Sequence, residues 1–204
     1  MRLQQFINYL LLEKKYSPNT VLAYQKDIEA FQLFLIHNFS DSDISQVNYS
    51  QIRTWIVQLV DGSNSNRTIN RKVSSLNSYY KFLLKTESIE VNPLHKHKAL
   101  KVSKKIQVPF SETEVSSVLN TININSFEGV RDKLIVELFY STGIRRIELV
   151  QLQLHDADLS QGHIKVLGKR NKERIIPLLP SVIKTFKIYL LERSKLEAII
   201  DDTI

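Results

Sequence analysis

One arginine and one lysine are of the types that could act together on a phosphate. Arg145 follows the Thr142-Gly143 pair, which breaks an apolar helical run, and Lys169 comes 24 residues later in a short polar turn. We expect Arg145 to be buried, and a buried guanidinium can bind two phosphate oxygens at once, while a nearby ammonium can protonate the leaving oxygen. The two residues therefore predict phosphoryl-transfer chemistry that needs no metal.

The hydrophobic patterns around these residues predict the elements that hold them. An apolar helix over 130–141 precedes Arg145, and apolar residues at helical spacing continue after it. The runs 163–167 and 174–178 are typical of strands, so the turn that carries Lys169 predicts a β-hairpin. A helix start and a hairpin tip would then direct two cations at one point.

Four short patterns follow one another over residues 139–178. They are T-G-[apolar]-R-x-x-E-L from Thr142, L-x-x-x-D near Asp156 and Asp158, G-K-x-N-K-x-R from Gly168, and a closing apolar-Pro-Leu strand. In this order and spacing they resemble the Xer-type tyrosine recombinases and phage integrases. The resemblance implies a site-specific recombinase that cuts and rejoins duplex DNA through a 3′-phosphotyrosyl intermediate, without a metal or another cofactor.

The resemblance also assigns roles to individual residues. Arg145 would hold the scissile phosphate, and Lys169 would be the general acid for the departing 5′ oxygen, with Lys172 on the same turn as its rival. Glu148 would contact Arg145 rather than the phosphate and would orient the arginine, although an ordinary polar helix residue explains this position too. Lys172 and Arg174 would contact DNA phosphates.

The turn itself departs from the family pattern at one position. Arg170 stands where the family usually has a glycine after the lysine. A residue with positive φ in this tight turn would therefore be Asn171, because asparagine tolerates the left-handed conformation better than most residues.

The positive charge of the chain is concentrated in its middle. Residues 62–105 carry 10 basic and 2 acidic side chains, whereas 1–61 carry 5 and 6, and 106–204 carry 13 and 13. The net charge of +7 thus comes from one segment. A local excess of this kind predicts a face that binds a polyanion.

Four amphipathic helices are predicted before residue 90. The second begins at a Ser17-Pro18 cap, the third ends at Asp61-Gly62, and Trp55 falls on an apolar stripe, which favours a core position over a contact with a partner. The apolar stripes of the first three are Leu3, Phe6, Ile7, Leu10 and Leu11; Val21, Tyr24, Ile28, Phe31 and Phe34; and Ile52, Trp55, Ile56, Leu59 and Val60.

The fourth helix, predicted from about Asn66 to Lys85, has a polar face without an acidic residue. A solvated helix face is one interpretation. The mixture of arginines, hydroxyls and an asparagine favours contact with phosphates and base edges, and it resembles the last helix of the recombinases' core-binding domain. The predicted DNA-binding residues of this face are Arg67, Asn70, Arg71, Ser74, Ser78 and Lys81.

These elements predict a mainly α fold of two domains. Residues 1–92 would form a four-helix, SAM-like core-binding domain, 93–109 a basic linker, and 110–204 the first part of an α+β catalytic domain with a small β-hairpin or sheet. Lys101 and Lys104 of the linker are expected to contact DNA. A capping box at Ser111 and Glu114 would open the second domain.

The family's remaining catalytic residues, a His-x-x-Arg pair and a tyrosine nucleophile, have no counterpart here. None of the five histidines precedes an arginine by three residues, and Tyr189 lies on the apolar side of the last predicted helix, Pro180 to about Ala198. The chain as given is therefore expected to bind DNA without cleaving it. A complete recombinase of which this is a part, or a non-catalytic DNA-binding decoy or regulator, both fit.

Composition limits the remaining possibilities. The chain has no cysteine, and His95 and His97 have no companions at metal-ligand spacing, so neither disulfides nor a metal site is expected. No apolar run reaches the roughly 18 residues that span a bilayer. We expect a cytoplasmic protein that is monomeric as given, from a parent that would be tetrameric on DNA at synapsis.

Overall fold

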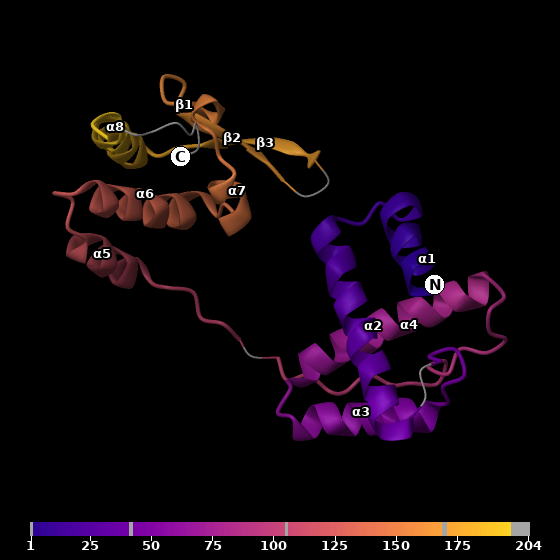
Figure 1. Cartoon of the computed structure of the whole chain (residues 1–204). Coiled ribbons are helices and arrows are strands. Elements are labelled where there is room, and N and C mark those ends of the chain that lie inside the picture. Colours follow the sequence, from indigo (N-terminus) through magenta and orange to yellow (C-terminus); the bar gives the residue numbers. More distant parts are fainter. Residues whose placement is uncertain (1, 41–42, 105, 169–170, 197–204) are drawn as a thin grey trace. The chain divides into compact units, whose positions relative to one another are not determined.

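The structure, a computed structural model, describes residues 2–40, 43–104, 106–168 and 171–196. The chain divides into two compact units, Met1–Ile106 and Gln107–Ile204, here called the N-terminal and C-terminal units (Figure 1). The predicted fold class is confirmed, because both units are mainly helical and the C-terminal unit adds a small antiparallel sheet. Within the described ranges, none of the helices combines the length and apolar character that a bilayer-spanning segment requires.

The N-terminal unit contains the four predicted helices. They are α1 (Arg2–Asn8) with its π-helical continuation η1 (Tyr9–Glu13), α2 (Pro18–Phe39), α3 (Tyr49–Asp61) and α4 (Asn66–Lys85). Polar side chains fix where the helices begin, since the hydroxyls of Ser17 and Ser65 accept hydrogen bonds from the third residue of α2 and α4, respectively. Asn48 and Gln51 form a capping box at the start of α3.

Aromatic side chains dominate the core of the N-terminal unit. The ring centroids of Phe31 and Trp55 lie 4.8 Å apart, and those of Phe6 and Tyr79 lie 5.2 Å apart. The side chain of Trp55 is 3% exposed, which confirms its predicted place in the core. Burial of rings of this size contributes a large share of the stability of a small domain.

Two residues of the predicted apolar stripes lie at the surface instead. Leu11 is 38% exposed because the amide of Lys14 bonds to the carbonyl of Tyr9, the i→i+5 pattern of a π-turn, which rotates the following residues away from the α-helical register. Val60 is 48% exposed because, at about 100° per residue, it lies at the edge of the stripe of α3, roughly 90° around the helix from the stripe's centre.

The first part of the predicted linker packs on the N-terminal unit. Leu94 is buried in the core, and Leu100 packs against it. The chain therefore stays on this unit for several residues beyond Asn92, where the sequence placed the domain boundary. Periodicity could not show this, because the contacts are made by an irregular segment.

The C-terminal unit combines helices with a three-stranded antiparallel sheet of order β1-β2-β3 (Figure 1). Its elements are α5 (Glu112–Thr121), α6 (Phe127–Thr142), α7 (Arg146–Val150), η2 (Leu154–Asp156), β1 (Ala157–Asp158), β2 (His163–Leu167), β3 (Glu173–Pro177) and α8 (Pro180–Ser194). The predicted hairpin is confirmed, with Ile164 opposite Ile176 and Val166 opposite Arg174. The short strand β1 was not predicted.

Helices α6 and α8 and strand β2 supply the core of this unit. Leu138, Ile164 and Phe186 are almost fully buried. Tyr189 is 3% exposed, and its ring stacks on Phe127 with centroids 5.5 Å apart. The prediction that Tyr189 is a core residue is confirmed.

The predicted break at Thr142-Gly143 positions Arg145. Gly143 ends α6 in the left-handed conformation, with φ of 61°, which glycine adopts without strain. The hydroxyl of Thr142 donates to the carbonyl of Leu138 at 2.6 Å and accepts from the amide of Ile144 at 3.2 Å. The chain is thereby turned so that Arg145 becomes the N-cap of α7.

Candidate active site and nucleic-acid interface

Arg145 is held at the start of α7 by the carboxylate of Glu148. Its backbone amide donates to Oε2 of Glu148 at 2.9 Å, and its Nη1 donates to Oε1 at 2.8 Å. Glu148 is 4% exposed, whereas the side chain of Arg145 is 65% exposed. The prediction that Arg145 is buried is wrong, because the buried member of the pair is Glu148, whose carboxylate holds an arginine side chain that is open to solvent. This is the orienting contact that the family resemblance implied for Glu148.

Arg174 of β3 binds the same carboxylate from the other side. Its Nη1 donates to Oε1 of Glu148 at 2.9 Å and its Nη2 to Oε2 at 2.8 Å, a two-pronged pair. The sequence predicted that Arg174 contacts phosphates, and the structure places it beside Arg145, with Glu148 between them. This arrangement joins α7 to the hairpin.

The hydrogen bonds around Glu148 lower the pKa of its carboxyl to about 2. The largest cause is the hydrogen bonding from Arg174; burial, the next largest, raises the pKa, and the bonds from Arg145 lower it further. Glu148 is therefore ionised at neutral pH, and the three side chains carry a net charge of +1. The guanidinium donors that Glu148 does not use can bind an anion such as a phosphodiester.

The hairpin turn lies against this cluster at Gly168. The amide of Gly168 donates to the carbonyl of Lys172 at 2.8 Å, and a Cβ atom at Gly168 would lie 3.1 Å from Nη1 of Arg174. Asn171 has a φ of 55°, which confirms the prediction that it takes the positive φ of the turn. Lys169, the predicted general acid, lies outside the described residues, and its neighbour Gly168 lies beside Arg174 and Glu148.

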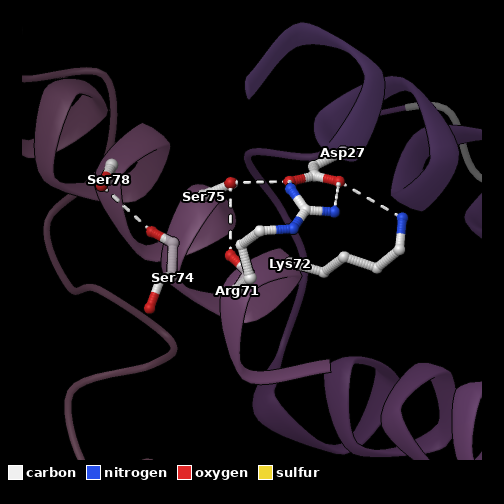
Figure 2. Close-up of polar contacts among 6 residues, drawn as sticks. All are labelled: Asp27, Arg71, Lys72, Ser74, Ser75 and Ser78. Atoms are coloured by element: carbon white, nitrogen blue, oxygen red, sulfur yellow. Dashed lines mark hydrogen bonds and ion pairs between the residues drawn. The ribbon is translucent and has the colours of Figure 1, made fainter. Parts of the chain in front are cut away.

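On α4, Arg71 is paired with a buried acid from another helix (Figure 2). Asp27 of α2 is 3% exposed. Its carboxylate accepts hydrogen bonds from both terminal nitrogens of Arg71, from Nζ of Lys72 at 3.2 Å and from the hydroxyl of Ser75 at 2.8 Å. The polar face of α4 has no acid of its own, as predicted, but α2 supplies one. Sequence reasoning missed Asp27, although an aspartate between Tyr24 and Ile28 interrupts the apolar stripe of α2.

The remaining polar side chains of α4 are open to solvent to different degrees. Arg67, Ser74 and Lys81 are exposed, and neither Arg67 nor Lys81 has an ion-pair partner among the described residues. The hydroxyl of Ser78 donates to the carbonyl of Ser74 at 3.0 Å, one turn earlier (Figure 2). The side chain of Arg71 is 51% exposed despite its pair with Asp27.

Asn70 makes contacts that the sequence did not predict. Its side-chain amide donates to the carbonyl of Leu100 at 2.8 Å and accepts from the amide of Leu100 at 2.9 Å. Nδ2 and Oδ1 of Asn70 are therefore both bonded to backbone atoms of Leu100, whereas the sequence predicted that Asn70 contacts DNA. Lys101 and Lys104 are exposed, as their predicted DNA contacts require.

No metal centre accompanies these residues in the part of the chain that the structure describes, because no three potential ligands among His, Cys, Asp and Glu come together there. His97 instead shares a hydrogen bond of 3.2 Å with the hydroxyl of Tyr49.

Comparison with known proteins gives both units a family. Residues 3–87 match the family described as phage integrase, N-terminal SAM-like domain, and residues 109–203 match the phage integrase family. Tyrosine recombinase XerD of Staphylococcus saprophyticus is 32% identical over 189 residues, which are 92% of this chain and 63% of that protein. The chain thus spans less than two thirds of the length of this relative.

Solved structures show the same fold. The Tn1549 transposon integrase in complex with a circular intermediate DNA aligns over 100% of this chain and 69% of its own, with a TM-score of 0.74 and 18% identity. A lambda integrase tetramer bound to a Holliday junction aligns over 92% of this chain and 54% of its own, with a TM-score of 0.69 and 16% identity. Since the two family matches follow each other in chain order and cover most of its length, the chain belongs to the phage integrase family of tyrosine recombinases.

Proposed function

We propose that this chain is the DNA-binding and phosphate-holding part of a site-specific recombinase. The observation that carries the proposal is the pair of guanidiniums of Arg145 and Arg174 on the buried carboxylate of Glu148, with Gly168 of the hairpin beside Arg174. Such a pair is preorganised to bind the scissile phosphate and to stabilise the charge that develops on it.

The proposed reaction belongs to the complete protein. A tyrosine oxygen would attack the phosphorus, the bond from phosphorus to the 5′ oxygen would break, and that oxygen would take its proton from Lys169, or from Lys172 on the same turn. Arg145 would hold the phosphate throughout, while Glu148 keeps Arg145 in place. Rejoining is the reverse of this step with another 5′ hydroxyl.

Duplex DNA is the proposed partner of the N-terminal unit. Arg67, Arg71 and Lys81 on α4 present exposed cations on one face, and Ser74 and Ser78 add hydroxyls. Both solved structures compared above are integrases bound to DNA, one of them a tetramer, which supports a complete protein that is tetrameric on its substrate.

A second function, that of a DNA-binding regulator without chemistry, is compatible with the position of Tyr189. Tyr189 is buried and stacked on Phe127, so it is not placed to attack a phosphate. We therefore expect this chain to bind a duplex but to form no covalent bond with it. Reading the coding DNA beyond codon 204 distinguishes the two functions, because a frame that continues with His-x-x-Arg and a late tyrosine indicates the recombinase.

The test is incubation of the chain with a nicked suicide duplex, followed by denaturing electrophoresis. We expect a mobility shift under native conditions and no covalent protein–DNA band. A covalent band that disappears in Tyr189→Phe, or in Tyr140→Phe on the exposed side of α6, would contradict the proposal for this chain.

A further inference from the structure

Two asparagines on α4 bind the backbone of the segment that follows the helix. Nδ2 of Asn66 donates to the carbonyl of Lys101 at 2.8 Å. Asn70 makes two bonds to the backbone of Leu100, one as donor at 2.8 Å and one as acceptor at 2.9 Å. Three hydrogen bonds therefore hold two consecutive residues of an irregular segment against a helix.

A third asparagine extends this contact along the helix. Oδ1 of Asn77 accepts from Nδ2 of Asn92 at 2.8 Å. Residues 66, 70 and 77 are four and seven positions apart, so they lie on one face of α4. We call Asn66, Asn70 and Asn77 the asparagine ladder.

The ladder sets the direction of the bound segment. Asn77 contacts residue 92, whereas Asn70 and Asn66 contact residues 100 and 101, so the segment runs back along α4 toward its first turn. Leu94, which is 4% exposed, anchors the segment between these contacts.

The held segment is rich in exposed lysines. Lys96, Lys98 and Lys101 are all open to solvent. They lie on a segment that borders the face of α4 carrying Ser74 and Lys81. Ser74 is four residues from Asn70, and Lys81 is four residues from Asn77. Fixed in this position, the lysines need little further ordering to bind a phosphate backbone, whereas lysines on a free tether lose conformational entropy on binding.

We propose that the asparagine ladder is a positioning device that makes residues 96–101 one edge of the DNA-binding surface. Asn66 and Asn70 act on DNA affinity through the lysines they position, and they do not read bases. This inference rests on the proposed binding of duplex DNA. It also implies that the free part of the linker between the two units begins after Lys101.

The first test is limited trypsin digestion of the 204-residue chain, which can be cut after Lys98, Lys101 and Lys104. In Asn66→Ala/Asn70→Ala we expect cleavage after Lys98 and Lys101 to be faster by about tenfold or more, because local opening no longer breaks three hydrogen bonds. Cleavage after Lys104 is the internal reference. Asn38→Ala is the matched control, since Asn38 donates to the carbonyl of Phe34 at 2.9 Å on another helix.

The second test measures binding of a fluorescent duplex of mixed sequence in a double-mutant cycle. In the unsubstituted chain, Lys101→Ala should weaken binding about threefold and reduce the slope of log affinity against log salt by about 1. In the Asn66→Ala/Asn70→Ala chain, Lys101→Ala should have a smaller effect on the affinity and on the slope. Where the double variant loses its helical circular dichroism, the single Asn66→Ala variant serves, because Asn66 is exposed and makes one bond.

The outcomes separate the two proposals. Unchanged trypsin cleavage would overturn the ladder, and an equal effect of Lys101→Ala in both backgrounds would overturn its positioning role while leaving duplex binding intact. An unsubstituted chain that binds no duplex would overturn the proposed function, and the inference with it.

Discussion

At the scale of single residues, Glu148 carries the organisation of the candidate active site. One buried carboxylate accepts two bonds from Arg145 and two from Arg174, which come from different elements. Without it, two guanidiniums would face each other with no compensating charge. The position of Arg145 thus depends on an acid three residues further along the chain.

Glu148→Gln should destabilise the chain by about 2 kcal/mol at neutral pH, since it removes charge-assisted hydrogen bonds from a buried site. Thermal unfolding followed by circular dichroism measures this. Glu173→Gln on the exposed edge of the hairpin is the control, and we expect little change there. An equal loss in the two variants would show that Glu148 is an ordinary polar residue.

The pKa of Glu148 also predicts a pH dependence. Its carboxyl titrates at about 2 in the folded chain and near the ordinary value of 4.5 when unfolded, so the unfolded state binds more protons between these values. The stabilisation is complete above pH 4.5 and is lost as the pH falls toward 2. The melting temperature of Glu148→Gln should therefore fall less steeply than that of the unsubstituted chain in this range. Parallel curves would contradict the assignment.

The sequence identified several of these residues but could not identify all of their contacts. The family resemblance pointed to the contact between Glu148 and Arg145, and the residue type of Asn171 pointed to its positive φ; the structure shows both. The pair of Arg174 with Glu148 depends on the fold bringing β3 to α7. Asp27 is even harder to find, because helical periodicity describes one helix at a time, whereas the acid that binds Arg71 belongs to another helix.

At the scale of elements, glycines at the two ends of α6 are required for different reasons. A Cβ atom at Gly129, near the start of the helix, would lie 1.6 Å from the carbonyl oxygen of Asn123. At Gly143, the left-handed cap, nothing lies within 4 Å of such an atom. The first glycine is required by close packing of backbone, and the second only by its positive φ.

These two positions predict an order of stabilities. Gly143→Ala should lower the free energy of unfolding by about 1 kcal/mol, because alanine is strained in the left-handed conformation. Gly129→Ala should cost more than about 2 kcal/mol, because a clash with backbone cannot be relieved by rotating a side chain. Urea unfolding of the two variants and of Glu128→Ala tests this. A Gly129→Ala variant as stable as Gly143→Ala would mean that the 123–129 loop is not packed as described.

Long helices were predicted most accurately from the sequence. The bounds of α4, Asn66 and Lys85, agree with the prediction because a serine cap and a strongly two-faced pattern define them. The π-turn of η1 and the two residues of β1 were not predicted, because each depends on tertiary packing rather than on a repeated pattern. The packed part of the linker was missed for the same reason.

At the scale of the whole molecule, the excess of charge in residues 62–105 bears on association as well as on binding. Like charges on the same surface oppose self-association at low salt. The C-terminal unit also has an apolar hollow of about 270 Å³, lined in part by Leu134, Leu138 and Tyr189. The hollow is smaller than most ligand pockets, which measure about 300–1,000 Å³.

We therefore expect the 204-residue chain to be a monomer without DNA. Light scattering coupled to size exclusion, at several protein concentrations, measures the mass directly. A dimer that persists on dilution would contradict this expectation, and loss of that dimer in Val150→Asp, at an exposed residue that lines the hollow, would place the contact there.

The central claim is that the chain binds duplex DNA through the cations of α4. The most direct measurement is the slope of log affinity against log salt concentration, for the unsubstituted chain and for Arg67→Ala/Arg71→Ala/Lys81→Ala. Each lost phosphate contact reduces the slope by about 0.9, so the triple variant should bind more weakly, by several kcal/mol, with a slope smaller by about 2 to 3. Glu87→Ala/Glu90→Ala, after the end of α4, controls for general changes to this region. An affinity and a slope that both remain unchanged in the triple variant would contradict the claim.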